Sequence, residues 1–300
     1  MNGTKKSVGA LTVALAVVGS VVLLGSGAAG AVNSVRDDTR TMSTSFSASQ
    51  AEELKVDVNS GELKIEYYAG SEVQFEASGD NADRWKVDAS DRTIRVQSPE
   101  HRFDWFSRDW FGGDWFDGDW LDDEWVGVNL FDNDSIPFRW AGGDSDSGAE
   151  ATLRLPDTLA GIDADLRLDA GKLEVDASFG QVDVTVNAGA LELAGSAEQL
   201  AVTVNAGQAD VDLDDVTTGA FSINAGRITA ELAGSLDSLD LRVSAGALTL
   251  TLPDQPYDLR RNETVGSIQS DLSEASNSRH RIDARLTAGN ITLRTDDSHD

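Results

Sequence analysis

A short unit that recurs along the chain constrains its fold more than any other feature. Within residues 182–193, apolar and polar side chains alternate up to Val186 and again from Leu191, on either side of Asn187-Ala188-Gly189. Such alternation is typical of half-buried strands. Because Val186 and Leu191 lie five residues apart, a straight strand would place them on opposite faces. Both can be buried only if the chain turns a corner at Asn-Ala-Gly, where glycine accepts a positive φ.

Seven such corner units are present. Their first and last residues are Asn59 and Gly61, Asp169 and Gly171, Asn187 and Gly189, Asn205 and Gly207, Asn224 and Gly226, Ser244 and Gly246, and Thr287 and Gly289. From Gly171 to Gly246 the glycines are spaced by 18, 18, 19 and 20 residues. A period of this size is the signature of stacked coils. The sequence therefore predicts an all-β, single-chain β-solenoid, with a ladder of Asn187, Asn205 and Asn224 along one corner. The alternative, an antiparallel sandwich, would show hairpin turns and variable strand lengths.

The amino-terminal region has the pattern of an export segment. Residues 1–7 contain Lys5 and Lys6, and residues 8–32 are apolar and uncharged. This length suits one transmembrane helix, and the lysines predict a cytoplasmic amino terminus with the rest of the chain outside the membrane. Ala29-Gly30-Ala31 resembles a signal-peptidase site, so secretion after cleavage near Ala31 is the alternative. Residues 33–50, rich in Ser and Thr, are predicted to be a spacer, and residues 51–300 the solenoid domain.

An aromatic and acidic insert, residues 101–148, interrupts the repeat. Five tryptophans occur at intervals of five, each preceded by an acidic residue: Trp105, Trp110, Trp115, Trp120 and Trp125. That period matches neither a helix nor a strand. The rings offer a large apolar area, which leaves three interpretations: a cap packed on the protein, a solvated loop, or a binding surface. In the third, the five tryptophans are ligand contacts for glycan rings or cationic groups.

Composition excludes several classes of function. A net charge of -28 repels nucleic acid, so we expect no nucleic-acid partner. The absence of cysteine excludes disulfides, thiolate metal sites and a catalytic thiol. His101, His280 and His299 have no metal-binding spacing and are predicted to be solvated, and no nucleotide-binding or hydrolase motif is present. The sequence therefore predicts no catalytic, cofactor-binding or metal-binding residues, and no cofactor.

The repeated units behind one amino-terminal span resemble the bacterial putative-adhesin family, a domain of unknown function related to the envelope-stress protein LiaG. The resemblance covers residues 44–295, with the interruption at 101–148. It implies a β-solenoid at the cell envelope and supplies no catalytic residues. The chain departs from the family pattern in the insert and in a wider coil around residues 253–285.

These features predict a non-catalytic, extracytoplasmic envelope protein, adhesin-like or associated with envelope stress, whose partner is cell-wall glycan or another envelope protein. One alternative is a solenoid enzyme that acts on polysaccharide, although turns such as residues 195–199 are too short to build a groove. Another is a self-assembling envelope scaffold. Charged residues near the last strand, Arg294, Asp296, Asp297 and Asp300, instead predict a blocked end.

Overall fold

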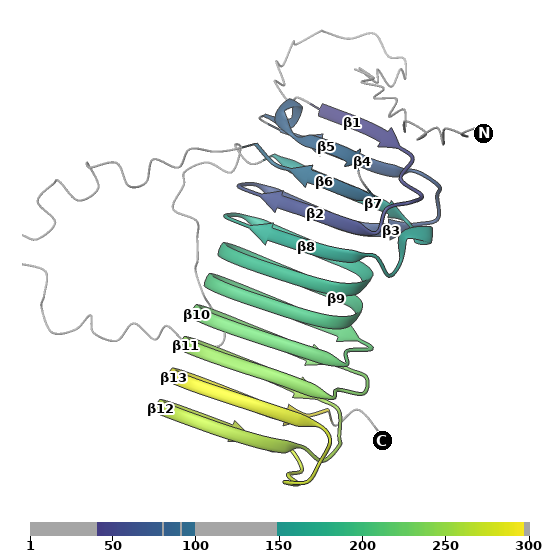
Figure 1. Cartoon of the computed structure of the whole chain (residues 1–300). Helices are drawn as coiled ribbons and strands as arrows, with labels where there is room; N and C mark the ends of the chain where they lie inside the picture. Colours follow the sequence, from purple (N-terminus) through teal and green to yellow (C-terminus); the bar gives the residue numbers. More distant parts are fainter. Residues whose placement is uncertain (1–40, 80, 91, 100–148, 297–300) are drawn as a thin grey trace, which may run out of the picture.

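The protein is an all-β structure. The computed structural model describes residues 41–79, 81–90, 92–99 and 149–296, which form strands and two single turns of 3-10 helix (Figure 1). The strands are β1 (Thr41–Phe46), β2 (Glu53–Val58), β3 (Glu62–Tyr68), β4 (Val73–Ser78), β5 (Lys86–Ser90), β6 (Thr93–Gln97), β7 (Glu150–Pro156), β8 (Asp163–Leu168), β9 (Lys172–Asp214), β10 (Thr218–Leu232), β11 (Ser238–Leu252), β12 (Asp258–Ser270) and β13 (Arg281–Thr295). The 3-10 turns are η1 (Ala82–Arg84) and η2 (Asp157–Leu159). The all-β prediction is confirmed.

All thirteen strands belong to one curled sheet. Its central strands are parallel, and their corner glycines lie beside one another. Ala164 of β8 lies beside Val182 of β9, a step of 18 residues. β10 pairs with β9 at a step of 19, and β11 pairs with β10 at a step of 20. The structure thus reproduces the spacing of the sequence repeat. The predicted turn at residues 195–199 is not a break, because these residues lie inside β9.

Each long strand bends at its corner unit, and both of its arms contribute to the core. In β10, Ile223 before the corner and Ile228 after it are both completely buried. Side chains alternate between buried and exposed along each arm. We call the outer surface of β5, β6, β2, β8 and the arms before the corners the leading face. The outer surface of β1, β4, β7, β3 and the arms after the corners is the trailing face.

The amino-terminal end of the sheet is antiparallel. β1 pairs with β4, β4 pairs with β7, and β5 pairs with β6. β1 lies within residues 33–50, so the spacer prediction is wrong over Thr41–Phe46. Its inward residues Thr44 and Phe46 are buried, and this burial is the reason the segment is ordered as a strand.

The carboxyl-terminal end has a crossed order that the sequence did not predict. β13 lies between β11 and β12, so the last strand in the chain is not the edge of the sheet (Figure 1). The blocked edge expected near Arg294 is instead formed by β12, whose one partner strand in the described part of the chain is β13. The described residues contain no helix long and apolar enough to cross a bilayer. The predicted span at residues 8–32 lies outside them.

Candidate functional site

The corner units stack into a column along the line at which the strands of the curled sheet bend. Gly226 lies beside Gly207 on one side and Gly246 on the other, and Gly246 lies beside Gly289. All seven predicted corner glycines have positive φ, and Gly207, for example, has a φ of 132°. A Cβ on Gly207 would lie 2.3 Å from the carbonyl oxygen of Gly189, so neither conformation nor space admits a side chain.

Gly266 of β12 forms an eighth corner. It has a φ of 119° and lies beside Gly289. The sequence analysis missed it because Thr264-Val265-Gly266 lacks the small middle residue of the other units. Gly266 therefore has the same role as the seven predicted corner glycines, because the corner requires a positive φ.

A ladder of side-chain hydrogen bonds runs along this corner column. Asn187 Nδ2 donates to Asp169 Oδ1, Asn205 Nδ2 donates to Asn187 Oδ1, and Asn224 Nδ2 donates to Asn205 Oδ1, each at 2.6 Å. These bonds form the ladder predicted from the repeat. Since each asparagine amide donates one hydrogen bond to the preceding repeat, the ladder fixes the register of four successive corners.

The corner column also holds both ends of the Trp/Asp insert. Ser98 precedes the insert, and its side-chain and carbonyl oxygens accept bonds from Asn59 N at 2.7 Å and Asn59 Nδ2 at 2.9 Å. Ala149 follows the insert, and its carbonyl oxygen would lie 2.6 Å from a Cβ on Gly61. The carbonyl oxygen of Gly189 would likewise lie 2.3 Å from a Cβ on Gly207. Ser98 and Ala149 therefore occupy corner positions, and β6 and β7 correspond to the arms before and after one corner.

The five tryptophans proposed as ligand contacts lie outside the described residues, as do His101 and His299. His280 is described, and it is buried rather than solvated, which corrects the prediction. Its Nδ1 lies 2.7 Å from the carbonyl oxygen of Leu236, and Arg279 Nε donates to its Nε2 at 3.1 Å. Because a carbonyl can only accept, Nδ1 is the donor to Leu236, and Asp237 Oδ1 lies 3.7 Å from the same nitrogen. The role of His280 is to join the loop before β13 to the turn before β11.

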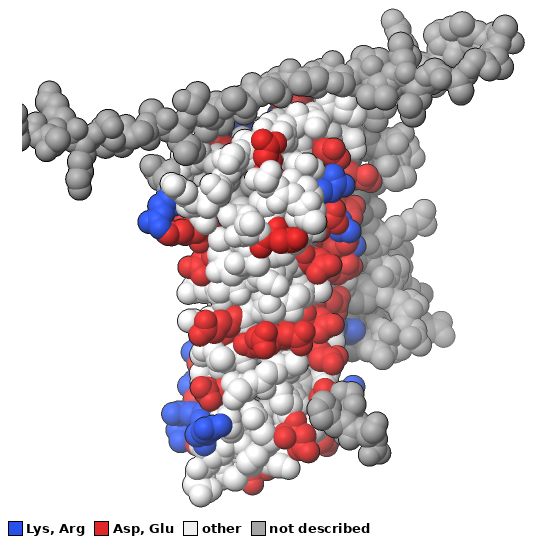
Figure 2. Space-filling model, turned by 90° about the vertical axis from the view of Figure 1, so that its right-hand side faces the viewer, with Lys and Arg blue, Asp and Glu red and all other residues white. Residues whose placement is uncertain are grey.

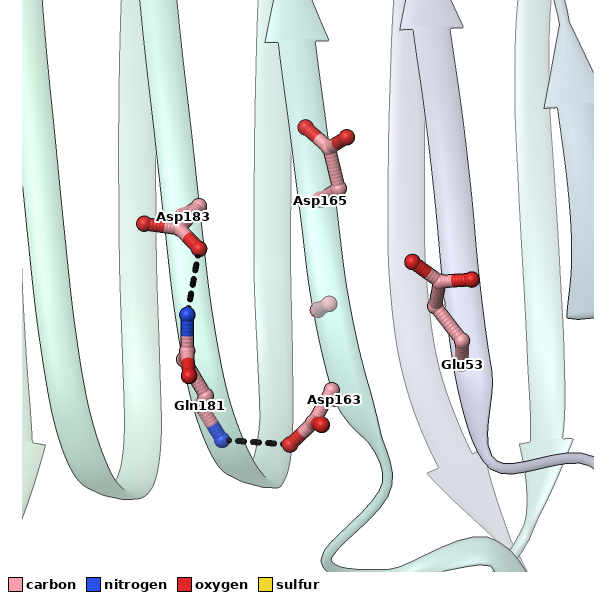
Figure 3. A pocket seen from close by; sticks show the side chains of 6 residues that line it. Glu53, Asp163, Asp165, Gln181 and Asp183 are labelled. Atoms are coloured by element: carbon pink, nitrogen blue, oxygen red, sulfur yellow. Dashed lines mark hydrogen bonds between the residues drawn. The ribbon is translucent and has the colours of Figure 1, made fainter.

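A shallow acidic hollow of about 380 Å³ lies on the leading face (Figure 3). It is lined by Glu53 of β2, Asp163 and Asp165 of β8, and Gln181 and Asp183 of β9. The sequence analysis did not find it, because β2 and β8 are more than a hundred residues apart in the chain and meet only through sheet pairing.

Hydrogen bonds hold several carboxylates of this hollow. The Gln181 backbone amide donates to Asp163 Oδ1 at 3.0 Å, and Gln181 Nε2 donates to Asp183 Oδ2 at 2.7 Å (Figure 3). A hydrogen bond from the ammonium group of Lys55 is the largest contribution that lowers the pKa of Glu53. Among the described residues, no three acidic or histidine side chains are placed to hold a metal ion. The chemistry available here is hydrogen-bond acceptance and the attraction of cations in solution.

Acidic residues dominate the rest of the described surface as well. Figure 2 shows Asp and Glu along the whole length of one side of the molecule, with Lys and Arg at fewer places. On the trailing face, Lys172 Nζ lies 3.0 Å from Glu192 and 3.5 Å from Glu174. Burial, and then the charge of Glu192, raise the pKa of Asp210. Lys64 of β3, also on the trailing face, lies 3.5 Å from Glu174 as well, so basic and acidic side chains form a paired network there.

Comparisons with known proteins do not identify a family or a function for this chain. No protein-family model and no curated protein matches the chain. A putative cell adhesion protein from Clostridium sporogenes overlaps with a TM-score of 0.35 at 13% identity, over 86% of this chain and 100% of that one. A putative adhesin from Bacteroides fragilis overlaps with a TM-score of 0.30 at 10% identity, over 86% and 97%. Structural overlaps this low carry no inference about the fold or function of this chain.

Proposed function

We propose that this chain is a non-catalytic, adhesin-like protein of the bacterial envelope, built as a β-solenoid and held outside the membrane by residues 8–32. The solenoid interpretation rests on the constant parallel register and on the single corner type. Each coil alone would leave its apolar side chains exposed, and stacking at strand spacing, about 4.8 Å, buries them in one continuous core.

The position of the insert is the observation that carries the proposed function. Its two flanking residues, Ser98 and Ala149, occupy the corner column, where every other coil turns within three residues. An insertion at this point leaves the pairing of β6 with β2 and of β7 with β3 intact. In this proposal the coils form a stiff acidic support, and the residues that flank the insert, Ser98 and Ala149, join it to the corner column.

Cell-wall glycan is the partner that fits this repeat best. The flat faces of sugar rings stack on tryptophan, and sugar hydroxyl groups donate hydrogen bonds to carboxylates. Acidic residues precede all five tryptophans, so the two kinds of contact alternate. The same carboxylates, together with the net charge of -28, disfavour contact with anionic lipid.

The acidic hollow supports a second candidate, an enzyme that acts on polysaccharide. Glycosidases use a pair of carboxylic acids on either side of the scissile bond. In this hollow, Asp163 and Asp183 already accept hydrogen bonds from Gln181, and Glu53 accepts from Lys55. A general acid needs a protonated carboxyl group, and the hydrogen bond from Lys55 lowers the pKa of Glu53, which favours its ionised form. The hollow therefore fits an acidic surface better than a catalytic pair.

Co-sedimentation of the full chain with purified cell wall tests the proposal. The comparison is between the natural protein, a variant with all five tryptophans replaced by Ser, and a hollow variant with Asp163→Asn, Asp165→Asn and Asp183→Asn. Trp140→Ser serves as the control for tryptophan outside the repeat. We expect the natural, hollow and Trp140 proteins to bind and the five-tryptophan variant to lose binding. Binding that survives the loss of all five tryptophans would contradict the proposal, and polysaccharide cleavage that the hollow variant abolishes would establish the enzyme.

A further inference from the structure

The leading face carries a regular pattern of charge. Two outward columns of side chains cross its strands: the first column contains Asp165 of β8, and the second contains Arg167, two residues further on. Because the strands are in register, each strand adds one residue to each column. On four strands the two positions hold opposite charges: Lys55 with Asp57, Asp165 with Arg167, Asp240 with Arg242, and Asp283 with Arg285.

The middle of the two columns holds small, uncharged side chains. Between Asp183 and Asp240 these are Thr185, Ala201, Thr203, Ala220 and Ser222, all of them partly exposed. From β5 to β12, at strand spacing of about 4.8 Å and with about five residues on each strand, the leading face measures about 43 Å by about 17 Å. The resulting area of about 700 Å² is close to the roughly 800 Å² that each partner contributes to a standard protein interface.

Two carboxylates in the columns are free. In the described part of the chain, neither Asp57 nor Asp165 has an ion-pair or side-chain hydrogen-bond partner (Figure 3). A basic residue lies two positions away on each strand but is bonded elsewhere, since Lys55 Nζ lies 3.0 Å from Glu53 and Arg167 lies 2.9 Å from Asp169. These carboxylates are therefore available to cations outside the monomer.

We propose that the leading face binds the leading face of a second copy of this chain, about a twofold axis that runs parallel to the stack of strands, midway between the two columns. This rotation places the first column of each copy opposite the second column of the other, strand by strand. Lys55 then faces Asp57 of the second copy, and Asp165 faces Arg167. At no described strand from β5 to β12 do two charges of the same sign face each other.

Other positions of the axis lose this match. An axis through either column places every charge opposite its own copy. A shift of one column away from the corners opposes Asp163 to Asp165, and a shift towards the corners leaves Arg242 opposite Ser244. Like charges that face each other across an interface, and charges without a partner there, weaken binding. The charge pattern therefore selects one register.

Reversing the stack, or using the other face, is also unfavourable. A twofold axis along the strand that contains Thr203 opposes Asp165 to Asp240, because these residues lie two strands away on either side. On the trailing face, positions two residues apart have the same sign in β9, as in Asp210 and Asp212. A second copy in the equivalent register is repelled there.

The contact is isologous and therefore closes at two copies. Both stacks point the same way, so the amino-terminal ends of the two copies lie at the same end of the dimer. This orientation is compatible with the anchoring of both copies in one membrane by residues 8–32, although the charge match itself is independent of that proposal.

Sedimentation velocity of the full chain in mild detergent tests the dimer. We expect the natural chain to dimerise reversibly, and Arg167→Asp with Arg242→Asp to weaken the dimer at least about a hundredfold, because carboxylates then face each other on two strands. Arg227→Asp with Arg294→Asp, on the trailing face, makes the same change in net charge and should leave the dimer unchanged. A natural chain that stays monomeric, or a dimer that the two double variants weaken equally, would overturn the proposal.

An exchange variant tests the register. Asp165→Arg, Arg167→Asp, Asp240→Arg and Arg242→Asp reverse the order of charge on two strands without changing composition. In the proposed register this variant still opposes unlike charges to its own copy, so it should dimerise as the natural chain does. It opposes like charges to the natural chain, so mixed dimers should be at least about tenfold rarer than the two homodimers.

Energy transfer between dyes measures the mixing. The dyes are attached at Thr229→Cys on the trailing face, and the chain has no other cysteine. An exchange variant that is monomeric, or that mixes freely with the natural chain, would contradict the register. Preferential formation of mixed dimers would instead indicate the reversed stack, in which Asp165 faces position 240.

Discussion

Asn205 joins its own repeat to the repeats on both sides, because its Nδ2 donates to Asn187 Oδ1 at 2.6 Å while its own Oδ1 accepts from Asn224 Nδ2 at 2.6 Å. Each bond joins residues one repeat apart in the sequence, 18 or 19 positions away. The ladder therefore forms because the repeat spacing places equivalent asparagines beside each other.

Asn205→Ala should cost about 1–3 kcal/mol of unfolding free energy, because it removes two hydrogen bonds and leaves a donor and an acceptor unpaired. Asn224→Ala, at the end of the ladder, removes one bond and should cost less. Urea unfolding of both variants measures the difference. Equal losses would show that the number of ladder bonds does not determine the stability of the stacked repeats.

Two glycine substitutions separate steric overlap from backbone conformation. Gly207→Ala places a Cβ 2.3 Å from the Gly189 carbonyl oxygen at a φ of 132°. Its cost should be at least about 3 kcal/mol, because overlap with the backbone adds to the strain of positive φ. Gly161→Ala also has positive φ, at 85°, but its Cβ would meet no atom within 4 Å.

Gly161→Ala should therefore cost only about 1–2 kcal/mol, the penalty of the conformation itself. Thermal unfolding of the two variants is the measurement. If both lose the same stability, close stacking of the corner column is not what selects glycine there.

Asp210 should destabilise the protein at neutral pH. Burial and Glu192 raise its pKa in the folded state, so its favourable contribution is present at low pH and is lost as the pH rises through that pKa. Asp210→Asn should then stabilise the protein at pH 7 by about 0.5 kcal/mol, the scale of partly exposed charge interactions.

The gain should vanish below about pH 3, where the carboxyl is protonated in both states. It should also shrink in a Glu192→Gln background, because part of the repulsion is already gone. Urea unfolding at pH 7 and pH 3 tests both points. A gain that is independent of pH would exclude an electrostatic cause.

The β12 edge should promote self-association of the protein when its inward-facing charges are removed. Arg261→Leu with Glu263→Val gives this strand apolar residues at the positions that face the core in β13. We expect concentration-dependent oligomers by light scattering, since an open apolar edge can accept another chain. Arg260→Leu with Asn262→Val adds similar apolar area on the outer face of the same strand, as the matched control. If both double variants assemble equally, added hydrophobicity and not an unblocked edge is responsible.

Sequence alone determined the features that depend on neighbouring residues and on the period. Alternation on either side of a small-Ala-Gly unit defines a strand, a corner and a second strand, because positive φ and side-chain direction are local properties. With a nearly constant repeat, equivalent residues must stack, so the buried Val186 and Leu191 and the asparagine ladder followed from the same pattern. The role of the tryptophan repeat stays a prediction.

Tertiary structure alone decided which distant segments meet. The strand character of Thr41–Phe46 comes from pairing with β4, and the segment's Ser/Thr composition gave no signal of it. The insertion of β13 between β11 and β12 made β12 the edge and buried His280 against Leu236. The acidic hollow likewise arises where β2 lies beside β8. These outcomes depend on the free energy of long-range pairing, to which a local pattern of side chains contributes no information.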